Sequence, residues 1–427
     1  MTAALWTSFA PADTVFEPGR IAVAARGHRI EYADGSTRLC ATSGLWNVPF
    51  GYGNPVVAEA VDRAMRDASY LSLFRAPHRA AMEAADALVD RAGSDAYARA
   101  IFSTAGGAAN DAVMKLVRQF WAQSGRPERT VVVGLRGSYH GTMHGSHALS
   151  GDDLLQSVYA LDRRGVRHVA HDDPDELESL LRREGDRVAA VVVEPVLGSG
   201  ARVLPDGFVR RLLALREKHG FLLVADEIAT GFARTGPLFA TDRWAAPPDV
   251  LVLSKALTNG AVAAAAILVG PRIAGAFARG GWTFVHAETQ AGTPVCAEAV
   301  LAVLREVDRI DAVATAGALG VRLRGLVDGL VADGLAAGVD GRGCFLAVRL
   351  VGADGAELTA TEVLTTVAAV AERGVIVHPE PSGVGLIPAF GFGEDDLLLL
   401  DGALRGALAE RRAESASDPD PHLGTRR

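Results

Sequence analysis

Short apolar runs alternate with longer segments of helical period through the middle of the chain. Segments such as 175–183 and 208–219 repeat apolar residues as one face of an amphipathic helix does. The runs between such segments are bounded by turn residues, and we interpret them as buried strands: 130–133, 188–193, 221–225, 250–253 and 264–269. This alternation predicts an α/β fold with a largely parallel, doubly wound sheet from about residue 51 to residue 300.

A second alternation follows toward the C-terminus. After a helix-rich segment, short strands are expected at 344–350 and 375–378 around another helix, as in a small α+β domain. A chain of 427 residues is long enough for two such units. We therefore expect an N-terminal segment that joins the small domain (1–50), a large domain (51–300), a C-terminal small domain (301–413) and a polar, aperiodic, disordered tail (414–427).

Charge and cysteine usage narrow the class of protein. A net charge of −8 disfavours a general nucleic-acid binder, which needs a basic face. Cys40, Cys296 and Cys344 lie far apart without metal-ligand spacing, so we expect no metal site and a reduced, intracellular protein. The N-terminus does not read as a signal peptide, and the most apolar stretch, 260–270, is too short to span a bilayer. A cytoplasmic protein with no membrane partner is expected.

Three of the predicted strands end in chemically useful residues. Glu194 follows the run 188–193, Asp226 follows 221–225, and Lys255 comes just after 250–253. Because ligands of open parallel sheets bind at the carboxyl ends of the strands, these side chains should converge on one crevice. A lysine there can form a Schiff base with a carbonyl cofactor, and an aspartate can keep a pyridine nitrogen protonated. A plain lysine–aspartate pair on the surface is the alternative.

The residues around these strand ends resemble the class III, fold type I aminotransferases. The resemblance rests on Glu194-Pro195-Val196, on the run 222–236 with its Asp226-Glu227 pair, and on Ser254-Lys255-Ala256-Leu257. It extends from about residue 45 to residue 343, with the motifs in the family's order. The resemblance implies the two-domain fold type I arrangement, with a seven-stranded type of sheet, and pyridoxal 5'-phosphate (PLP) as cofactor.

The same resemblance assigns roles to the strand-end residues. It implies that Asp226 pairs with the pyridine nitrogen, that Ile228 packs on one face of the ring, and that Glu194 belongs to the cofactor site. Lys255 would hold PLP as an imine and would move the substrate's Cα proton, which is general acid–base work. Lys255 and Asp226 are thus the catalytic candidates.

A glycine turn before a predicted helix is the candidate phosphate site. Ala105, Gly106 and Gly107 stand where the family has a serine-glycine-small triplet, and a helix N-terminus there would offer free N–H groups to the phosphate. Ala105 lacks the family's hydroxyl, which Ser103 or Thr104 is expected to replace. A further departure is Ala108, which stands where the family has a glutamate.

Two further motifs match the family. In Tyr139-His140-Gly141, Tyr139 would stack on the ring face opposite Ile228, and His140 would have a structural role in the cofactor site. Thr289, in the loop 286–294, would bind the PLP phosphate from the neighbouring subunit, which implies a homodimer. The alternatives are a half-buried loop tyrosine and an ordinary loop threonine.

The substrate region departs from the family. Many members carry an arginine for a substrate carboxylate three residues before a proline, and Gly385 stands there instead. Trp46 and Phe74 are expected to form an apolar wall, and Arg75 is a candidate for holding the carboxylate of an amino donor. At least one substrate should therefore be an amine, ketone or aldehyde without an adjacent carboxylate. It could be a biosynthetic intermediate, a modified sugar or a ketone on a peptide end.

The expected reaction is a two-step transfer of an amino group from a donor amine to a carbonyl acceptor. Racemases and aminomutases of this superfamily use the same apparatus, and they differ in needing no second carbonyl substrate. A scaffold or binding protein without PLP is an alternative of another class. Retention of both Asp226 and Lys255 speaks against it.

Overall fold

The computed structural model describes residues 4–352 and 354–417. A seven-stranded sheet forms the centre of the large domain, in the order β4-β10-β9-β8-β7-β5-β6. Its strands are β4 (Arg99–Ser103), β5 (Val131–Leu135), β6 (Val166–Val169), β7 (Val188–Val193), β8 (Leu222–Asp226), β9 (Val250–Leu253) and β10 (Ala265–Val269). Pairing is parallel from β9 to β6, whereas β10 runs antiparallel to both of its neighbours. The predicted, largely parallel sheet is confirmed.

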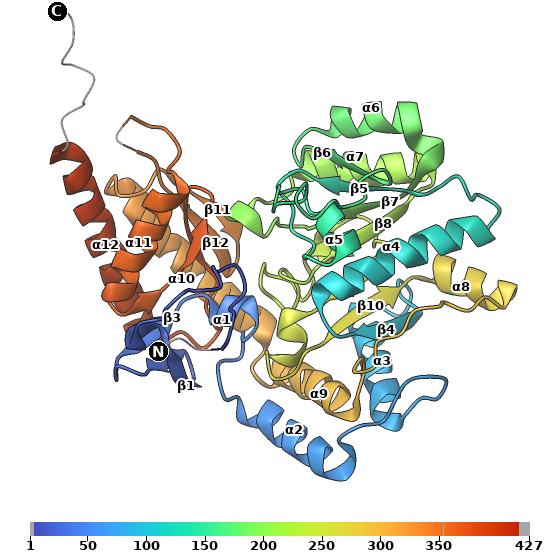
Figure 1. Ribbon diagram of the computed structural model, residues 1–427, viewed down its shortest axis with the longest axis horizontal. Coiled ribbons are helices and arrows are strands. Elements are labelled where there is room, and N and C mark those ends of the chain that lie inside the picture. The colour runs from blue at the N-terminus through green and yellow to red at the C-terminus, as the bar shows by residue number, and fades with distance from the viewer. Residues whose placement is uncertain (1–3, 353, 418–427) are drawn as a thin grey trace, which may run out of the picture.

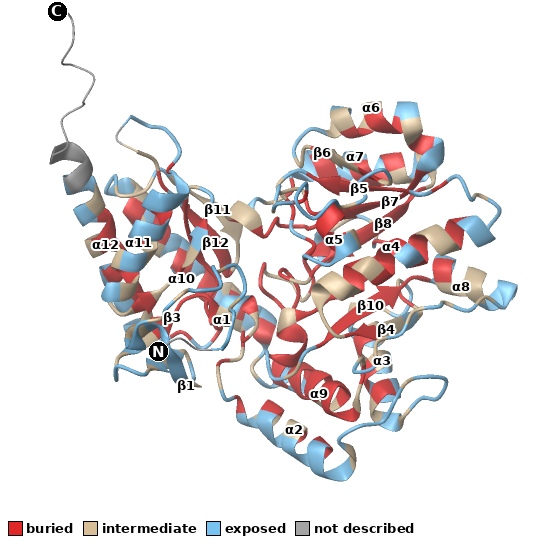
Figure 2. Cartoon of the chain, viewed as in Figure 1, coloured by how far each residue is buried: buried red, intermediate tan, exposed pale blue. Residues whose placement is uncertain are grey.

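Helices cover both faces of this sheet (Figure 1). The helices of this part of the chain are α2 (Pro55–Ala68), α3 (Arg79–Ala92), α4 (Gly106–Gln123), α5 (His144–Leu149), α6 (Pro174–Glu184), α7 (Asp206–His219), α8 (Pro271–Gly280) and α9 (Pro294–Arg309). Of these, α2 packs on α9 and not on the sheet itself. Alternate residues of one strand point to opposite faces, so Val192 packs with α4 and Val191 packs with α6 and α7. Burial on both faces explains why the strands read as continuous apolar runs, and Figure 2 shows them buried beneath the helices.

The small domain contains a second, antiparallel sheet in the order β11-β12-β15-β14. Its elements are β11 (Gly338–Arg342), β12 (Phe345–Arg349), β14 (His378–Glu380), β15 (Gly383–Leu386) and the helices α10 (Ala312–Ala332), α11 (Ala360–Glu372) and α12 (Glu394–Ser417). The helices lie on the outer side of the sheet, and β11 and β12 lie toward the large domain (Figure 1). This sheet packs against the large domain, because Phe345 and Ala347 of β12 belong to one buried cluster with Val196 and Ala229.

The N-terminal segment pairs with the small domain. A sheet in the order β1-β2-β3-β13 joins β1 (Ala22–Arg26), β2 (Arg29–Tyr32) and β3 (Thr37–Cys40) to β13 (Val375–Ile376). The single strand expected at 375–378 is thus divided, because β13 pairs with β3 whereas β14 pairs with β15. A short helix, α1 (Ser43–Trp46), leads from β3 toward the large domain.

The C-terminal end differs in part from expectation. The predicted tail begins at residue 414, whereas α12 runs through Ser417, and residues 418–427 lie outside the described part of the chain. The other predicted domain boundaries stay predictions. None of the helices within residues 4–352 and 354–417 has the length and apolar content that a membrane crossing requires.

Candidate active site

Lys255 lies at the carboxyl end of β9, at the start of a short 3-10 turn (Lys255–Thr258). Its φ of 47° falls in the left-handed region, which a non-glycine residue adopts only when the surrounding structure imposes it. The hydroxyl of the preceding Ser254 donates to the carbonyl of Ala264 at 2.7 Å, which ties the turn to β10. The Nζ atom of Lys255 lies 4.0 Å from the centroid of the Trp46 ring. The turn therefore directs the amine at an aromatic wall.

The environment of Lys255 favours its neutral amine. Burial lowers the pKa of Lys255 to about 8, while the charges of Glu194 and Asp226 oppose that change. Glu194, at the end of β7, accepts hydrogen bonds from the backbone N–H groups of Tyr139 (2.9 Å) and Gly198 (3.1 Å). Burial raises the pKa of Glu194 to about 7. A lysine with a pKa near neutrality can act both as a nucleophile and as a proton carrier.

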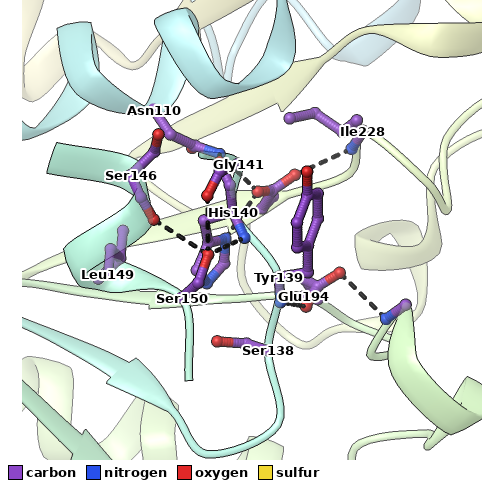
Figure 3. A network of polar contacts seen from close by, with 12 residues as sticks. Asn110, Ser138, Tyr139, His140, Gly141, Ser146, Leu149, Ser150, Glu194 and Ile228 are labelled. Carbon is purple, nitrogen blue, oxygen red and sulfur yellow. Dashed lines mark hydrogen bonds and ion pairs between the residues drawn. The ribbon is translucent and has the colours of Figure 1, made fainter. Parts of the chain in front are cut away.

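Asp226, the last residue of β8, is held by three donors (Figure 3). Its Oδ2 atom accepts from Nδ2 of Asn110 at 2.8 Å and from Nδ1 of His140 at 2.7 Å. Its Oδ1 atom accepts from the backbone N–H of Ile228 at 3.1 Å. The carboxylate is therefore fixed in orientation and nearly sequestered from solvent, with 3% of its surface exposed.

The candidate phosphate site is the N-terminus of α4. This helix begins at Gly106, and its N-cap residue, Ala105, makes no side-chain capping bond, so the first N–H groups lack a cap. A Cβ atom on Gly106 would lie 2.6 Å from Cδ1 of Ile228. Glycine at position 106 thus lets the helix end approach the side chain that is expected to flank the cofactor ring.

The hydroxyls expected to replace the missing serine are engaged elsewhere. Ser103 Oγ donates to Glu288 at 2.5 Å, and Thr104 donates to the same carboxylate from both its hydroxyl and its backbone N–H. Sequence reasoning missed Glu288. The available signal was a negative charge directly before Thr289.

The remaining predicted residues lie on loops outside the helices and strands. Tyr139 is 40% exposed in the loop after β5, and its backbone N–H donates to Glu194 (Figure 3). Thr289 is exposed, and its carbonyl accepts from the hydroxyl of Tyr70 at 3.1 Å. Phe74 and Arg75 stack on each other on an exposed loop, with the guanidinium 5.2 Å from the ring centroid. These last three residues do not line the cavity at Lys255 in the single chain.

That cavity has a volume of about 680 Å³. Among the residues that line it are Asn47, Tyr52, Thr104, Gly106 and Lys255. It therefore connects the lysine at the end of β9 with the N-terminus of α4.

The arrangement fits PLP. Asp226 offers a buried carboxylate for a ring nitrogen, α4 offers a helix N-terminus without a cap, and Lys255 offers an amine of lowered pKa. When bound, PLP supplies a reactive carbonyl group and a ring that withdraws electrons. Within the described residues, no cluster of His, Cys, Asp and Glu could hold a metal ion.

Comparison with known proteins agrees with this site. The family model described as aminotransferase class-III matches residues 12–406. Over 77% of its length the chain is 35% identical to the acetylornithine aminotransferase of Mycobacterium tuberculosis, of which the match covers 79%. Over 67% it is 32% identical to the putrescine–pyruvate aminotransferase of Pseudomonas aeruginosa, of which it also covers 67%. The chain belongs to the class III aminotransferase family.

A solved structure extends the likeness to the whole fold. An amine transaminase from an uncultivated Pseudomonas species, in its PLP-bound form, superposes with a TM-score of 0.88 at 27% identity, covering 96% of this chain and 99% of that one. The chain is accordingly a PLP-dependent aminotransferase that acts on small-molecule amine and carbonyl substrates.

Proposed function

We propose that this aminotransferase moves an amino group from a donor amine or amino acid to a ketone or aldehyde that lacks an adjacent carboxylate. One observation carries the proposal. At Gly385, where many family members have their carboxylate-binding arginine, the space beside the backbone is taken by the carboxyl group of Glu380. A negative charge at this place repels a substrate carboxylate instead of pairing with it. We further propose that the reaction serves biosynthetic metabolism in the cytoplasm.

The roles of the site residues complete the proposal. Lys255 receives and returns the proton of the reacting carbon, because with a pKa of about 8 its amine is populated in both the neutral and the protonated form near that pH. Asp226 pairs with the ring nitrogen, supported by Asn110 and His140. Tyr139 and Ile228 flank the ring, Glu194 sets the charge near Lys255, and Ala105, Gly106 and Gly107 receive the phosphate. Trp46, which is 8% exposed, forms the apolar wall of the substrate site.

We also propose that the active unit is a homodimer. Thr289, Phe74 and Arg75 are exposed in the single chain and would serve the site of the neighbouring subunit. Nearby loops also expose apolar side chains, including Leu71 and Val285, which supports the proposal that a second subunit covers this surface. A single chain would then lack part of its phosphate site and part of its substrate site.

The substrate class is tested by a paired kinetic comparison. Simple ketones and the α-keto acids of the same carbon skeleton are offered as acceptors with one amino donor, and kcat/KM is measured for each. The proposal expects the ketones to be preferred. A strong preference for keto acids that survives Arg75→Ala would overturn it. Turnover of one amine without any carbonyl co-substrate would instead favour a racemase or aminomutase.

The dimer is tested by mixing two inactive variants. Lys255→Ala and Thr289→Ala proteins are each prepared as homodimers and then allowed to exchange subunits. If Thr289 serves the neighbouring site, one site of every mixed dimer contains both native residues, so activity should reappear at low PLP concentration. Failure to regain activity, with exchange confirmed by mass spectrometry of the intact dimers, would place Thr289 in its own subunit's site or outside both.

A further inference from the structure

Gly385 lies on the face of the small-domain sheet that is turned toward Lys255. In β15, Gly385 pairs with Ala347 of β12 and with His378 of β14, so these three residues share one face. The neighbouring residues Val384 and Leu386 point the other way, into the core of the small domain. Ala347 instead packs in a cluster that contains Trp46. A side chain at position 385 would therefore project toward the large domain.

Glu380 occupies that projection. It lies two residues after His378 on the same strand and hence on the same face. A Cβ atom on Gly385 would lie 2.5 Å from Oε1 of Glu380. The carboxyl group thus lies over the glycine, in the space that the side chain of any larger residue at position 385 would occupy.

One oxygen of this carboxyl group has a partner and the other does not. Oε2 accepts the backbone N–H of Gly200 at 2.6 Å. Oε1 is buried without a hydrogen-bond partner among the described residues, and the residue is 6% exposed. None of the ion pairs between described residues involves Glu380. Because a buried polar atom without a partner costs free energy, this oxygen is suited to a ligand that brings a donor.

Two ring contacts connect the strand of the unpartnered oxygen with the reacting amine. The ring of His378 lies 5.5 Å from the ring of Trp46, and Nζ of Lys255 lies 4.0 Å from the centroid of that same Trp46 ring. Burial lowers the pKa of His378, and the charge of Lys255 lowers it further. Lys255 therefore interacts electrostatically with a residue of β14. Trp46 and His378 therefore lie in turn between Lys255 and the strand that carries Glu380, which places the carboxyl group beside the region of the reacting amine.

We infer that Glu380 is a substrate-binding residue whose Oε1 atom accepts a hydrogen bond from an N–H or O–H group next to the reacting carbon of the substrate. This inference deepens the proposed function and rests on it. The substrate class becomes amines and ketones with a neighbouring amine, amide or hydroxyl donor, in the place where the family's keto acids carry a carboxylate. Burial raises the pKa of Glu380 to about 7, so the group is an anionic acceptor above that pH.

Three related amines test the inference. They are alaninol, sec-butylamine and alanine, in which the carbon that bears the amine also carries a methyl group and, in turn, a hydroxymethyl, an ethyl and a carboxylate group. Each is mixed with the PLP-loaded enzyme at about pH 9, where Glu380 is ionised, and the change in the visible absorption of the cofactor gives a second-order rate constant. We expect alaninol to react roughly ten- to hundredfold faster than sec-butylamine, as a hydrogen bond to a charged group predicts.

Glu380→Gln is the principal variant. The N–H of Gly200 would donate to the one amide oxygen of glutamine. The amide nitrogen would then face the substrate, and it is not a hydrogen-bond acceptor. The alaninol to sec-butylamine ratio should fall, because the amide can offer the hydroxyl only a weaker, neutral hydrogen bond, and the rate constant for alanine should rise because a repulsive charge is gone. Glu372→Gln, which replaces an exposed glutamate of α11, is the matched control. It should change neither the alaninol to sec-butylamine ratio nor the rate constant for alanine.

Gly385→Ala provides a second variant, which keeps the glutamate but moves its carboxyl group. The added Cβ would displace Oε1, and since a glutamate side chain is flexible, the fold should tolerate the change. The alaninol preference should fall here as well. Binding is followed in parallel as the shift of the thermal unfolding midpoint of each protein with saturating alaninol and with saturating sec-butylamine.

The outcomes are separable. Equal rate constants for alaninol and sec-butylamine in the native enzyme, or a preference that survives both Glu380→Gln and Gly385→Ala, would overturn the inference and leave the proposed function intact. If the native enzyme reacts with alanine far faster than with either other amine, the inference fails as well, whereas the proposed function, which admits an amino-acid donor, is tested separately by the comparison of ketones with keto acids. A preference reduced in both variants and kept in Glu372→Gln supports the inference.

Discussion

The Nδ1 atom of His140 lies 2.7 Å from Oδ2 of Asp226, and both side chains are buried. Burial disfavours a charged imidazole, but the hydrogen bond to Asp226 and the charges of Asp226 and Glu194 outweigh it and raise the pKa of His140. The imidazole thus supports the negative charge of Asp226 at the place where the ring nitrogen of PLP is expected. His140 is then a positioning residue, as the structural role expected for it implies.

Replacing Lys255 with alanine should abolish amino transfer. The variant lacks both the amine that attaches the cofactor and the base that moves the proton, so kcat should fall by roughly a thousandfold or more. PLP should still bind through Asp226 and the N-terminus of α4, which equilibrium dialysis would detect. Amino transfer at a near-native rate in Lys255→Ala would refute the assigned mechanism.

Asp226→Asn should lower kcat on the order of a hundredfold or more while the fold survives. The substitution keeps the shape of the side chain but removes the charge that stabilises a protonated ring nitrogen. It also leaves His140 and Asn110 without their carboxylate acceptor. The absorption spectrum and kcat are measured together, with the exposed Asp62→Asn as control. Native kcat in Asp226→Asn would mean that the cofactor ring lies elsewhere.

The lowered pKa of Lys255 predicts a pH dependence of the PLP-free protein. The folded amine has a pKa of about 8, below the ordinary lysine value, so between these pH values the unfolded chain binds more protons than the folded chain. The free energy of unfolding should therefore rise with pH above about 8, relative to a Lys255→Met variant. Urea titrations at a series of pH values measure this difference, and parallel curves for the two proteins would contradict the assigned pKa.

Glu194→Gln tests the charge that opposes this shift. The carboxylate of Glu194 raises the pKa of Lys255, and it is ionised above its own pKa of about 7. Its removal should move the pKa of Lys255 further down. The rate of PLP uptake by the PLP-free protein should then reach its plateau at a lower pH, because only the neutral amine reacts with the cofactor's carbonyl group. An unchanged or higher midpoint would show that Glu194 does not act on Lys255 through its charge.

Gly141→Ala should destabilise the fold by about 2–4 kcal/mol. The residue has a φ of 118°, and a Cβ atom there would lie 2.5 Å from Cα of Gly107, at the start of α4. The clash is between backbones, so no side-chain rotation relieves it. Gly402→Ala, in α12 with open space around its position, is the control and should stabilise by about 0.5–1 kcal/mol. Chemical denaturation of both variants measures the difference.

Much of the site was predictable because it depends on local pattern. The apolar runs predicted β7, β8 and β9, and ligands of parallel sheets bind at the carboxyl ends of the strands, so the pattern alone indicated that Glu194, Asp226 and Lys255 converge. The roles of these three residues in one cofactor site stay predictions. Each of the three strand-end residues ends a strand or follows it closely, so its position depends on the strand alone.

The sequence by itself determined the class of fold, the strand-end residues and the absence of an arginine at position 385. The tertiary structure alone decided that Asn110 and His140 hold Asp226, that Glu288 binds Ser103 and Thr104, and that Glu380 lies over Gly385. Most of these contacts join residues of different elements. The position of Glu380 over Gly385 depends on the register between β14 and β15, which the sequence does not indicate. Periodicity reports which face of its own element a residue occupies, whereas such contacts depend on how separate elements pack, which no local pattern encodes.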